Sequence, residues 1–254
     1  MKNNQSERKK SSLPFNINKK SFFGVISLIS QEIIERILTG LKFKSSKEDE
    51  VLKLVRTKAN QNDPESVLKI IDDYAYKKTF LMNIGDEKGL YLEKAIRQSE
   101  AKNILELGVY LGYSTIRILK TLKNKSTLTS IESNEKFADI AREHINIAGL
   151  GKNHHLLIGK SSEIIPNLTG QYDFIFIDHW KDLYLKDLKI LEKHSLLKKN
   201  AWVFADNVIL FNLEDYLAYV RTSPNYESTF IPTLREYSNN HPDGIEISIF
   251  KNEI

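Results

Sequence analysis

Two hydrophobic patterns alternate along the chain beyond residue 60. Short apolar runs of strand length recur at regular intervals, and amphipathic segments of helical length lie between them. The runs that predict strands are Asn103–Leu107, Leu128–Glu132, His155–Ile158, Tyr172–Asp178 and Ala201–Asp206. Strands that alternate with helices indicate βαβ units, so we expect a doubly wound, mostly parallel α/β sheet with helices on both faces.

The helices and the end of the sheet follow from the same reading. Asp63-Pro64 and Gly85-Asp86 have the residue types that begin helices. Further helices are expected at Thr115–Leu122, Glu135–Ala148 and Leu183–Leu197. Ser228–Ile231 and Gly244–Phe250 have no helix between them, which predicts a C-terminal antiparallel hairpin. The charged stretch 42–53 reads as a linker or an exposed helix start.

The first 50 residues differ from the rest, and we treat 1–50 as a basic tail with an amphipathic helix and 51–254 as the main domain. Phe22, Val25, Ile29 and Ile33 recur at helical spacing, which predicts a helix over about 21–40. The apolar run within it is too short to span a bilayer. The preceding lysines suit an anionic membrane surface, but we favour a helix that docks on the main domain, because most amphipathic helices cover a core.

Composition narrows the class of protein. The 254 residues are 41% hydrophobic and 28% charged, which describes a soluble globular chain and excludes a disordered one. A net charge of +4 is too small to argue for a nucleic-acid partner. The absence of cysteine excludes disulfides, thiolate zinc sites and a cysteine nucleophile. It also fits a reducing compartment, so we expect a cytoplasmic location.

The exit of the first predicted strand has features of a nucleoside-binding loop. Gly108 and Gly112 allow a tight turn and a close approach to a ligand ahead of a helix. Tyr110 occupies the second glycine of the dinucleotide fingerprint and blocks a pyrophosphate. Glu132, at the end of the second strand, can accept hydrogen bonds from ribose hydroxyls, or it is a surface acid. Together these residues favour a nucleoside cofactor and argue against NAD.

The exits of the fourth and fifth strands carry oxygen ligands. Adjacent parallel strands would bring Asp178, Asp206 and Asn207 together, and this oxygen-only set suits Mg²⁺. Lys181 lies three residues past Asp178 in an aromatic setting, where a lysine beside a cation can lose its proton and act as a base. A divalent cation would also help a phenol, whose pKa is near 10, to ionise at neutral pH.

Four motifs resemble the catechol O-methyltransferase family. They are Asn83-Ile84-Gly85-Asp86, Leu105-Glu106-Leu107-Gly108 with Gly112-Tyr113-Ser114, Asp178-His179-Trp180-Lys181-Asp182 and Ala205-Asp206-Asn207-Val208. The similarity runs from about Thr57 to Phe250. It implies a seven-stranded, Rossmann-like methyltransferase fold, S-adenosylmethionine and Mg²⁺ as cofactors, and a small-molecule catechol as the substrate. The oligomeric state and the hydroxyl that receives the methyl group are left open.

The resemblance also implies roles for individual residues. Asp178, Asp206 and Asn207 would bind Mg²⁺. Lys181 would be the general base, and Glu236 would hold the second hydroxyl of the catechol. Glu132 would bind the ribose. The residues expected around the remainder of the cofactor are Met82, Ile84, Glu106, Gly108, Tyr110, Ser114, Ser161 and His179.

The walls of the substrate site depart from the family pattern. The residues that we expect to contact substrate are Phe80, Trp180, Phe211 and Arg235. Phe80 stands where mammalian enzymes have tryptophan, Phe211 where they have proline, and Arg235 where they have an apolar residue. Our hypothesis is that Arg235 favours catechols that bear a carboxylate over cationic catecholamines, unless it only points into solvent.

Two other functions fit the same residues. One is a Mg²⁺-dependent O-methyltransferase for another vicinal-dihydroxy aromatic, such as a flavonoid or a caffeoyl compound. The other is a non-catalytic S-adenosylmethionine-binding protein, although a degraded site should have lost its ligands. A nucleic-acid amino-methyltransferase is disfavoured, because its Pro-Pro-aromatic motif is replaced here by Asp178-His179-Trp180-Lys181.

Overall fold

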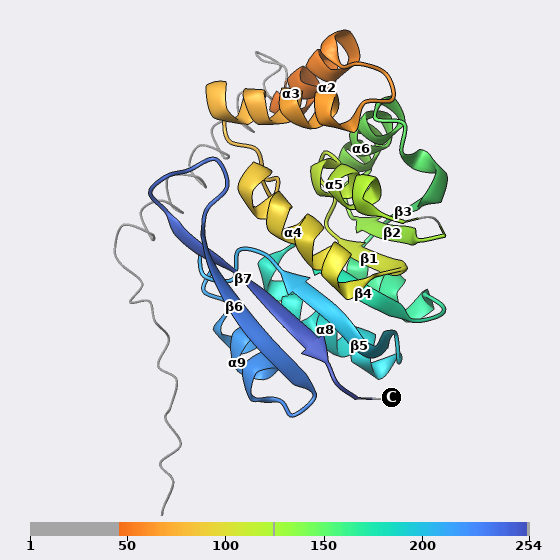
Figure 1. Cartoon of the computed structure of the whole chain (residues 1–254), viewed down its shortest axis with the longest axis vertical. Helices are drawn as coiled ribbons and strands as arrows, with labels where there is room; N and C mark the ends of the chain where they lie inside the picture. The colour runs from red at the N-terminus through yellow and green to blue at the C-terminus, as the bar shows by residue number, and fades with distance from the viewer. Residues whose placement is uncertain (1–45, 124, 253–254) are drawn as a thin grey trace, which may run out of the picture.

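A seven-stranded sheet in the order β3-β2-β1-β4-β5-β7-β6 lies at the centre of the computed structural model, which describes residues 46–123 and 125–252 (Figure 1). Its strands are β1 (Asn103–Leu107), β2 (Thr127–Glu132), β3 (His154–Ile158), β4 (Tyr172–Ile177), β5 (Leu197–Ala205), β6 (Tyr226–Leu234) and β7 (Pro242–Phe250). The first five strands are parallel, and β7 runs antiparallel to both β5 and β6. The predicted parallel sheet and terminal hairpin are confirmed.

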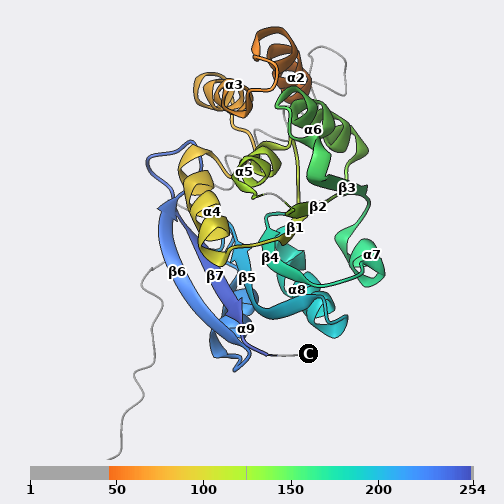
Figure 2. The same ribbon diagram turned by 45° about the vertical axis from the view of Figure 1, so that its right-hand side comes forward.

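Helices cover both faces of the sheet (Figures 1 and 2). One face carries α4 (Asp86–Ser99), α5 (Tyr113–Thr121) and α6 (Glu135–Ile147), with α2 (Lys47–Lys58) and α3 (Pro64–Lys77) packed outside α5 and α6. The other face carries α7 (Ser161–Ile164), α8 (Tyr184–Lys193) and α9 (Glu214–Thr222). Each face has its own hydrophobic cluster, so the sheet is buried between two cores, as a parallel sheet requires.

Local sequence explains where several helices begin and end. The Asp63 carboxylate accepts a hydrogen bond from the amide of Ser66 and caps α3, whose first residue is Pro64. The Asn134 side chain caps α6 in the same way. Gly85 precedes α4 with a φ of 78°, a left-handed conformation that glycine adopts without strain.

Two sequence-based predictions were wrong in their extent. Of the two interpretations of 42–53, a linker or an exposed helix start, the helix start is correct, because Ser46 caps α2 there, but Glu48 and Val51 are buried and not exposed. This helix spans the predicted domain boundary at residues 50 and 51. The helix predicted to reach Leu197 ends at Lys193, because Ser195 adopts a φ of 54° and turns the chain into β5. The short helix α9 was not predicted.

The terminal hairpin is longer than the sequence indicated. Its strands pair from Tyr226 with Phe250 to Leu234 with Pro242. The connecting loop, residues 235–241, is closed by a hydrogen bond from the amide of Arg235 to the carbonyl of His241. The hairpin thereby carries Glu236 to the beginning of α4, where it becomes part of the site described below.

The N-terminal predictions are not tested by the structure. The helix expected over 21–40 and the basic residues before it lie outside the described residues. Within residues 46–123 and 125–252, no helix combines the length and the apolar character that crossing a membrane requires.

Candidate active site

The carboxyl ends of four parallel strands converge at one edge of the sheet. The amide of Asp178 donates to the carbonyl of Leu107 at 2.9 Å, and the amide of Asp206 donates to the carbonyl of Ile177 at 3.2 Å. The loops after β1, β4 and β5 therefore lie in a row. Because β1 pairs with both β2 and β4, this edge includes the point where the strand order reverses, which is where open α/β sheets bind ligands.

Lys181 connects the exits of β4 and β5. Its ammonium group lies 2.8 Å from Asp178 Oδ1, 3.0 Å from Asn207 Oδ1 and 2.8 Å from the hydroxyl of Tyr184. Lys181 belongs to a short 3₁₀ helix, Lys181–Leu183, that follows β4 directly. Through Lys181, the exits of the two adjacent strands that carry Asp178 and Asn207 are in contact with the same ammonium group.

Asp206 is fully buried, and it forms an ion pair with Lys88 of α4. The ammonium group of Lys88 lies 2.8 Å from both carboxylate oxygens of Asp206. Burial, together with the neighbouring carboxylates, raises the pKa of Asp206 to about 8 despite this ion pair.

The donor set and the charge fit a divalent cation. The acidic groups of Asp178, Asp206, Glu236 and Asp243 outnumber the two ammonium groups that contact them. In the part of the chain that the structure describes, no three histidine, cysteine or acidic side chains form a metal-binding group. A metal here would thus need the amide oxygen of Asn207 besides two carboxylates, a hard oxygen set of the kind that Mg²⁺ prefers.

The loop of the terminal hairpin brings Glu236 to this cluster. Glu236 Oε2 lies 2.8 Å from the ammonium group of Lys88 and accepts a hydrogen bond from Asn207 Nδ2 at 3.2 Å. The approach depends on Gly85, because a Cβ atom at that position would lie 2.8 Å from the Cβ of Glu236. Glu236, 29 positions from Asn207 in sequence, thus reaches Asn207 because residue 85 has no side chain.

Aromatic and cationic side chains surround the polar cluster. The guanidinium of Arg235 lies over the ring of Phe80, 5.3 Å from its centroid, and does not simply project into solvent. Burial lowers the pKa of Arg235. Phe211 lies beneath the ammonium group of Lys181 at 5.4 Å, and Trp180 is 72% exposed. Of the four residues predicted to contact substrate, Arg235 and Phe80 form one cation–π pair, Phe211 forms another with Lys181, and Trp180 has an exposed indole.

The glycine loop after β1 meets the acid at the end of β2. Glu132 Oε2 accepts hydrogen bonds from the amides of Val109 and Tyr110, at 3.1 and 2.9 Å. Tyr110 adopts a φ of 50°, and its hydroxyl donates to Glu48 of α2 at 2.8 Å. Glu132 thus lies beside the glycine loop, and its carboxylate holds the shape of the loop.

Glu106 is completely buried beside this loop. Its carboxylate accepts hydrogen bonds from the hydroxyls of Ser114, Thr115 and Ser130 at 2.6 to 2.8 Å. Burial outweighs these bonds and raises the pKa of Glu106 to about 7. Glu106 and Ser114, both predicted to lie near the cofactor, are thus hydrogen-bonded to each other.

The other predicted cofactor residues occupy varied positions. His179 Nε2 lies 2.8 Å from the buried Asp187, and the His179 ring stacks on Tyr184 at 5.3 Å. Ser161 is buried at the start of α7. Ile84 is buried in the core, whereas Met82 is 41% exposed.

Sequence reasoning missed Lys88 and Asp243. Lys88 lies on the same helical stripe as Leu92, Ala95 and Ile96, all of which are buried. A lysine within an apolar stripe was therefore an available signal for a buried cation. Asp243 gave no comparable signal, because its position depends on the register of the hairpin.

Comparisons with known proteins agree with this geometry. A family model described as O-methyltransferase matches residues 57–214. The catechol O-methyltransferase B of Danio rerio is 38% identical over 235 residues, covering 90% of this chain and 88% of that protein. The catechol O-methyltransferase of Mus musculus is 36% identical over 234 residues, with the same two coverages.

Solved structures agree on the fold. The crystal structure of the O-methyltransferase TomG from Streptomyces achromogenes in complex with SAM superposes with a TM-score of 0.65 at 21% identity, covering 73% of this chain and 89% of that one. The solved structure shows the fold, and the sequence relatives with the family model show the family. The chain belongs to the catechol O-methyltransferase family.

Proposed function

We propose that the protein transfers a methyl group from S-adenosylmethionine to one hydroxyl of a catechol in a Mg²⁺-dependent reaction. The observation that carries the proposal is the contact of Lys181 with both Asp178 and Asn207, at 2.8 and 3.0 Å, beside the glycine loop of β1. A candidate base, oxygen ligands for a metal and a nucleoside-binding loop are thereby adjacent. The alternatives are another vicinal-dihydroxy aromatic as the substrate, or cofactor binding without catalysis.

The cofactor would lie along the exits of β1 and β2. We assign the ribose to Glu132, whose two oxygens already accept three backbone amides and retain lone pairs for hydroxyl donors. The other residues assigned to the cofactor are Met82, Ile84, Glu106, Gly108, Tyr110, Ser114, Ser161 and His179. Such a placement directs the methyl group towards the exits of β4 and β5, where the acceptor would be held.

Asp178, Asp206 and Asn207 would hold the metal. Bound there, Mg²⁺ would lower the pKa of a phenol and fix its orientation. The surplus of acidic groups over lysines among the surrounding side chains supports a divalent ion over a monovalent one. Lys181 contacts two of these three residues, so ion and lysine would share their oxygens.

Lys181 would accept the proton of the hydroxyl that becomes methylated. A phenol and an ordinary lysine have similar pKa values, about 10 and 10.4, so proton transfer to a neutral Lys181 costs little. A cation nearby favours the neutral form of the lysine. Glu236 would accept a hydrogen bond from the second hydroxyl, since one of its oxygens, Oε2, is already fixed by Lys88 and Asn207.

Phe80, Trp180, Phe211 and Arg235 would form the walls around the ring substituents. The guanidinium of Arg235 is stacked on Phe80, and within the described residues its Nε has no hydrogen-bond partner. A stacked guanidinium with an unpartnered Nε supports a preference for catechols that carry an acidic substituent.

Turnover of catechol with S-adenosylmethionine tests the proposal. We expect methylated product with Mg²⁺ present, none after chelation with EDTA, and recovery when Mg²⁺ is restored. Cofactor binding without turnover of any diol would support the non-catalytic alternative. Faster methylation of a caffeoyl or flavonoid diol than of simple catechols would support the other substrate class.

A further inference from the structure

Lys88 joins three carboxylates that come from three separate parts of the fold. Its ammonium group lies 2.8 Å from both oxygens of Asp206, 2.8 Å from Glu236 Oε2 and 3.0 Å from Asp243 Oδ2. The lysine side chain is 1% exposed. Asp206 follows β5, Glu236 lies in the hairpin loop and Asp243 lies in β7, so a single buried nitrogen fixes their relative positions.

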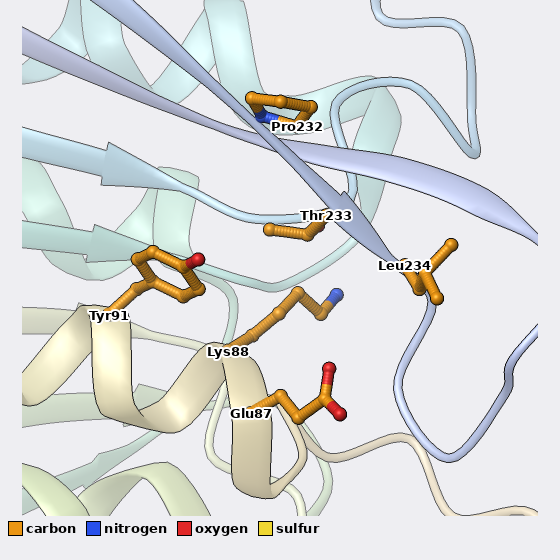
Figure 3. Close-up of a pocket in the computed structure, with 6 residues that line it drawn as sticks. All are labelled: Glu87, Lys88, Tyr91, Pro232, Thr233 and Leu234. Carbon is orange, nitrogen blue, oxygen red and sulfur yellow. The ribbon is translucent and has the colours of Figure 1, made fainter.

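Lys88 belongs to α4, so its nitrogen reaches the three carboxylates from the side of the cluster that α4 covers. Figure 3 shows the Lys88 side chain leaving α4 and extending towards the end of β6 at Leu234. A groove on the outer surface is lined by Glu87, Lys88, Tyr91, Pro232, Thr233 and Leu234. Since the lysine is buried, its hydrocarbon chain covers the cluster on this side and its charge is directed inwards.

Asp243 determines which way the amide of Asn207 faces. Asn207 Nδ2 donates to Asp243 Oδ2 at 2.8 Å and to Glu236 Oε2 at 3.2 Å. The opposite orientation would place the amide oxygen against two carboxylates, which is unfavourable. Asn207 Oδ1 is therefore directed to the other side, where it accepts a hydrogen bond from Lys181 at 3.0 Å.

Asp243 is itself rigidly held. Its second oxygen accepts a hydrogen bond from the amide of Leu210 at 3.1 Å, and the residue is 3% exposed. With Lys88 on one side and a backbone amide on the other, the carboxylate has one orientation available to it. Lys88 thus holds Asp243, and Asp243 in turn holds Asn207.

We propose that Lys88 and Asp243 are positioning residues for the metal and the acceptor: Asp243 orients the Asn207 amide oxygen towards the metal, and Lys88 holds Asp243, Asp206 and Glu236 in register. The inference rests on the proposed function, because it assigns a purpose to ligands that the proposal names. Partners of this kind that orient metal ligands typically change metal affinity by about 10- to 100-fold when they are replaced.

Asp243→Asn tests the orientation directly. The new amide can donate as well as accept, so it no longer forces Asn207 Nδ2 towards it. We expect the Kd for Mg²⁺, measured by isothermal titration calorimetry on the enzyme with S-adenosylmethionine and no catechol, to rise about 10- to 100-fold. Unchanged Mg²⁺ affinity in a folded Asp243→Asn variant would overturn the proposal.

Glu93→Gln provides a matched control. Glu93 is a buried carboxylate on the same helix as Lys88, and it pairs with Arg117 at 2.6 Å and Lys120 at 3.0 Å, away from Asn207. Its replacement should lower the thermal unfolding temperature but leave Mg²⁺ affinity unchanged. An equal loss of Mg²⁺ affinity in Glu93→Gln would mean that Asp243 acts only through general stability, which contradicts the proposal.

Lys88→Met gives a second measurement. The methionine keeps much of the length of the side chain but removes the charge that holds Glu236, so the KM for catechol should rise by about tenfold or more. An unchanged KM would contradict the role of Lys88.

If the wild-type enzyme neither binds nor needs Mg²⁺, the proposed function and this inference fail together. Normal Mg²⁺ binding by both wild type and Asp243→Asn overturns the inference alone.

Discussion

Gly108 and Asp178 are packed so closely that a Cβ atom at residue 108 would lie 2.6 Å from the carbonyl oxygen of Asp178. Gly108 begins the loop that we assign to the cofactor, and Asp178 begins the loop that we assign to the metal. The two halves of the candidate site are therefore in contact through their backbones. The glycine is needed for this contact as well as for its φ of 94°.

Gly108→Ala should therefore damage both halves at once. A left-handed conformation costs an alanine about 1–2 kcal/mol, and the contact with Asp178 adds a steric cost because the obstacle is backbone. We expect a loss of more than about 2 kcal/mol in the free energy of unfolding, measured with urea, and weaker binding of S-adenosylmethionine.

Gly170→Ala separates the two costs. Gly170 has a φ of 82°, but no atom lies within 4 Å of the position of its missing Cβ. This variant should show the conformational cost alone and normal cofactor binding. Equal losses of stability and of affinity in the two variants would argue against the close packing of Gly108 on Asp178.

Lys181→Ala should fold and bind S-adenosylmethionine but lose turnover. The lysine makes its hydrogen bonds within the candidate site, and loss of a general base typically costs about 10²- to 10⁴-fold in rate. The exposed Lys186, five residues further along, serves as the control, because its replacement by alanine should leave kcat unchanged. A Lys181→Ala enzyme with wild-type kcat would exclude Lys181 from proton transfer.

Arg235→Leu should change substrate preference more than it changes overall activity. Removal of the guanidinium should lower the ratio of kcat/KM for a catechol carboxylic acid to that for a catecholamine by about tenfold, the effect of one charge-assisted hydrogen bond. The exposed Arg142 gives a control, since Arg142→Leu changes the net charge equally. The idea is wrong if the wild-type enzyme prefers the amine.

The residues of the candidate site that could be predicted from sequence are those at strand ends. Asp178, Asp206 and Asn207 follow β4 and β5, and adjacent parallel strands bring such residues together whatever the details of packing. Glu132, at the end of β2, contacts the loop of Gly108 for the same reason. Hydrophobic periodicity determined the sheet, and the sheet determined these neighbours.

The contacts of Lys88 could not be predicted in this way. Its partners Asp206 and Asp243 are 118 and 155 residues away, and the second depends on how the hairpin is registered against β5. The sequence left α2 open as a linker or an exposed helix start because its residues are highly charged, whereas its stability comes from burying Glu48 and Val51 against the main domain. Tertiary contacts decided both cases.

His144 gives the last prediction, which concerns stability and pH. Its ring is buried, and Nδ1 lies 2.9 Å from the carbonyl of Leu111 in the glycine loop, while burial lowers the pKa of His144 to about 4. An unfolded histidine titrates near 6.5, so the unfolded chain binds a proton that the folded protein excludes between these values. This contribution to stability is complete above pH 6.5 and is lost as the pH falls towards 4.

His144→Gln should therefore cost less stability in acid than at neutral pH. Between pH 7.5 and pH 5, wild type loses about 2 kcal/mol through this group, and the variant does not, so the gap between their unfolding free energies should narrow by that amount. Measuring the gap also cancels the opposite effect of Asp72 and Glu106, whose raised pKa values of about 6 and about 7 favour the folded state at lower pH. Replacing the exposed His155 by glutamine is the matched control for the substitution itself. A constant gap for His144→Gln would mean that the ring takes up its proton at the same pH in the folded and unfolded states, which contradicts the effect of burial.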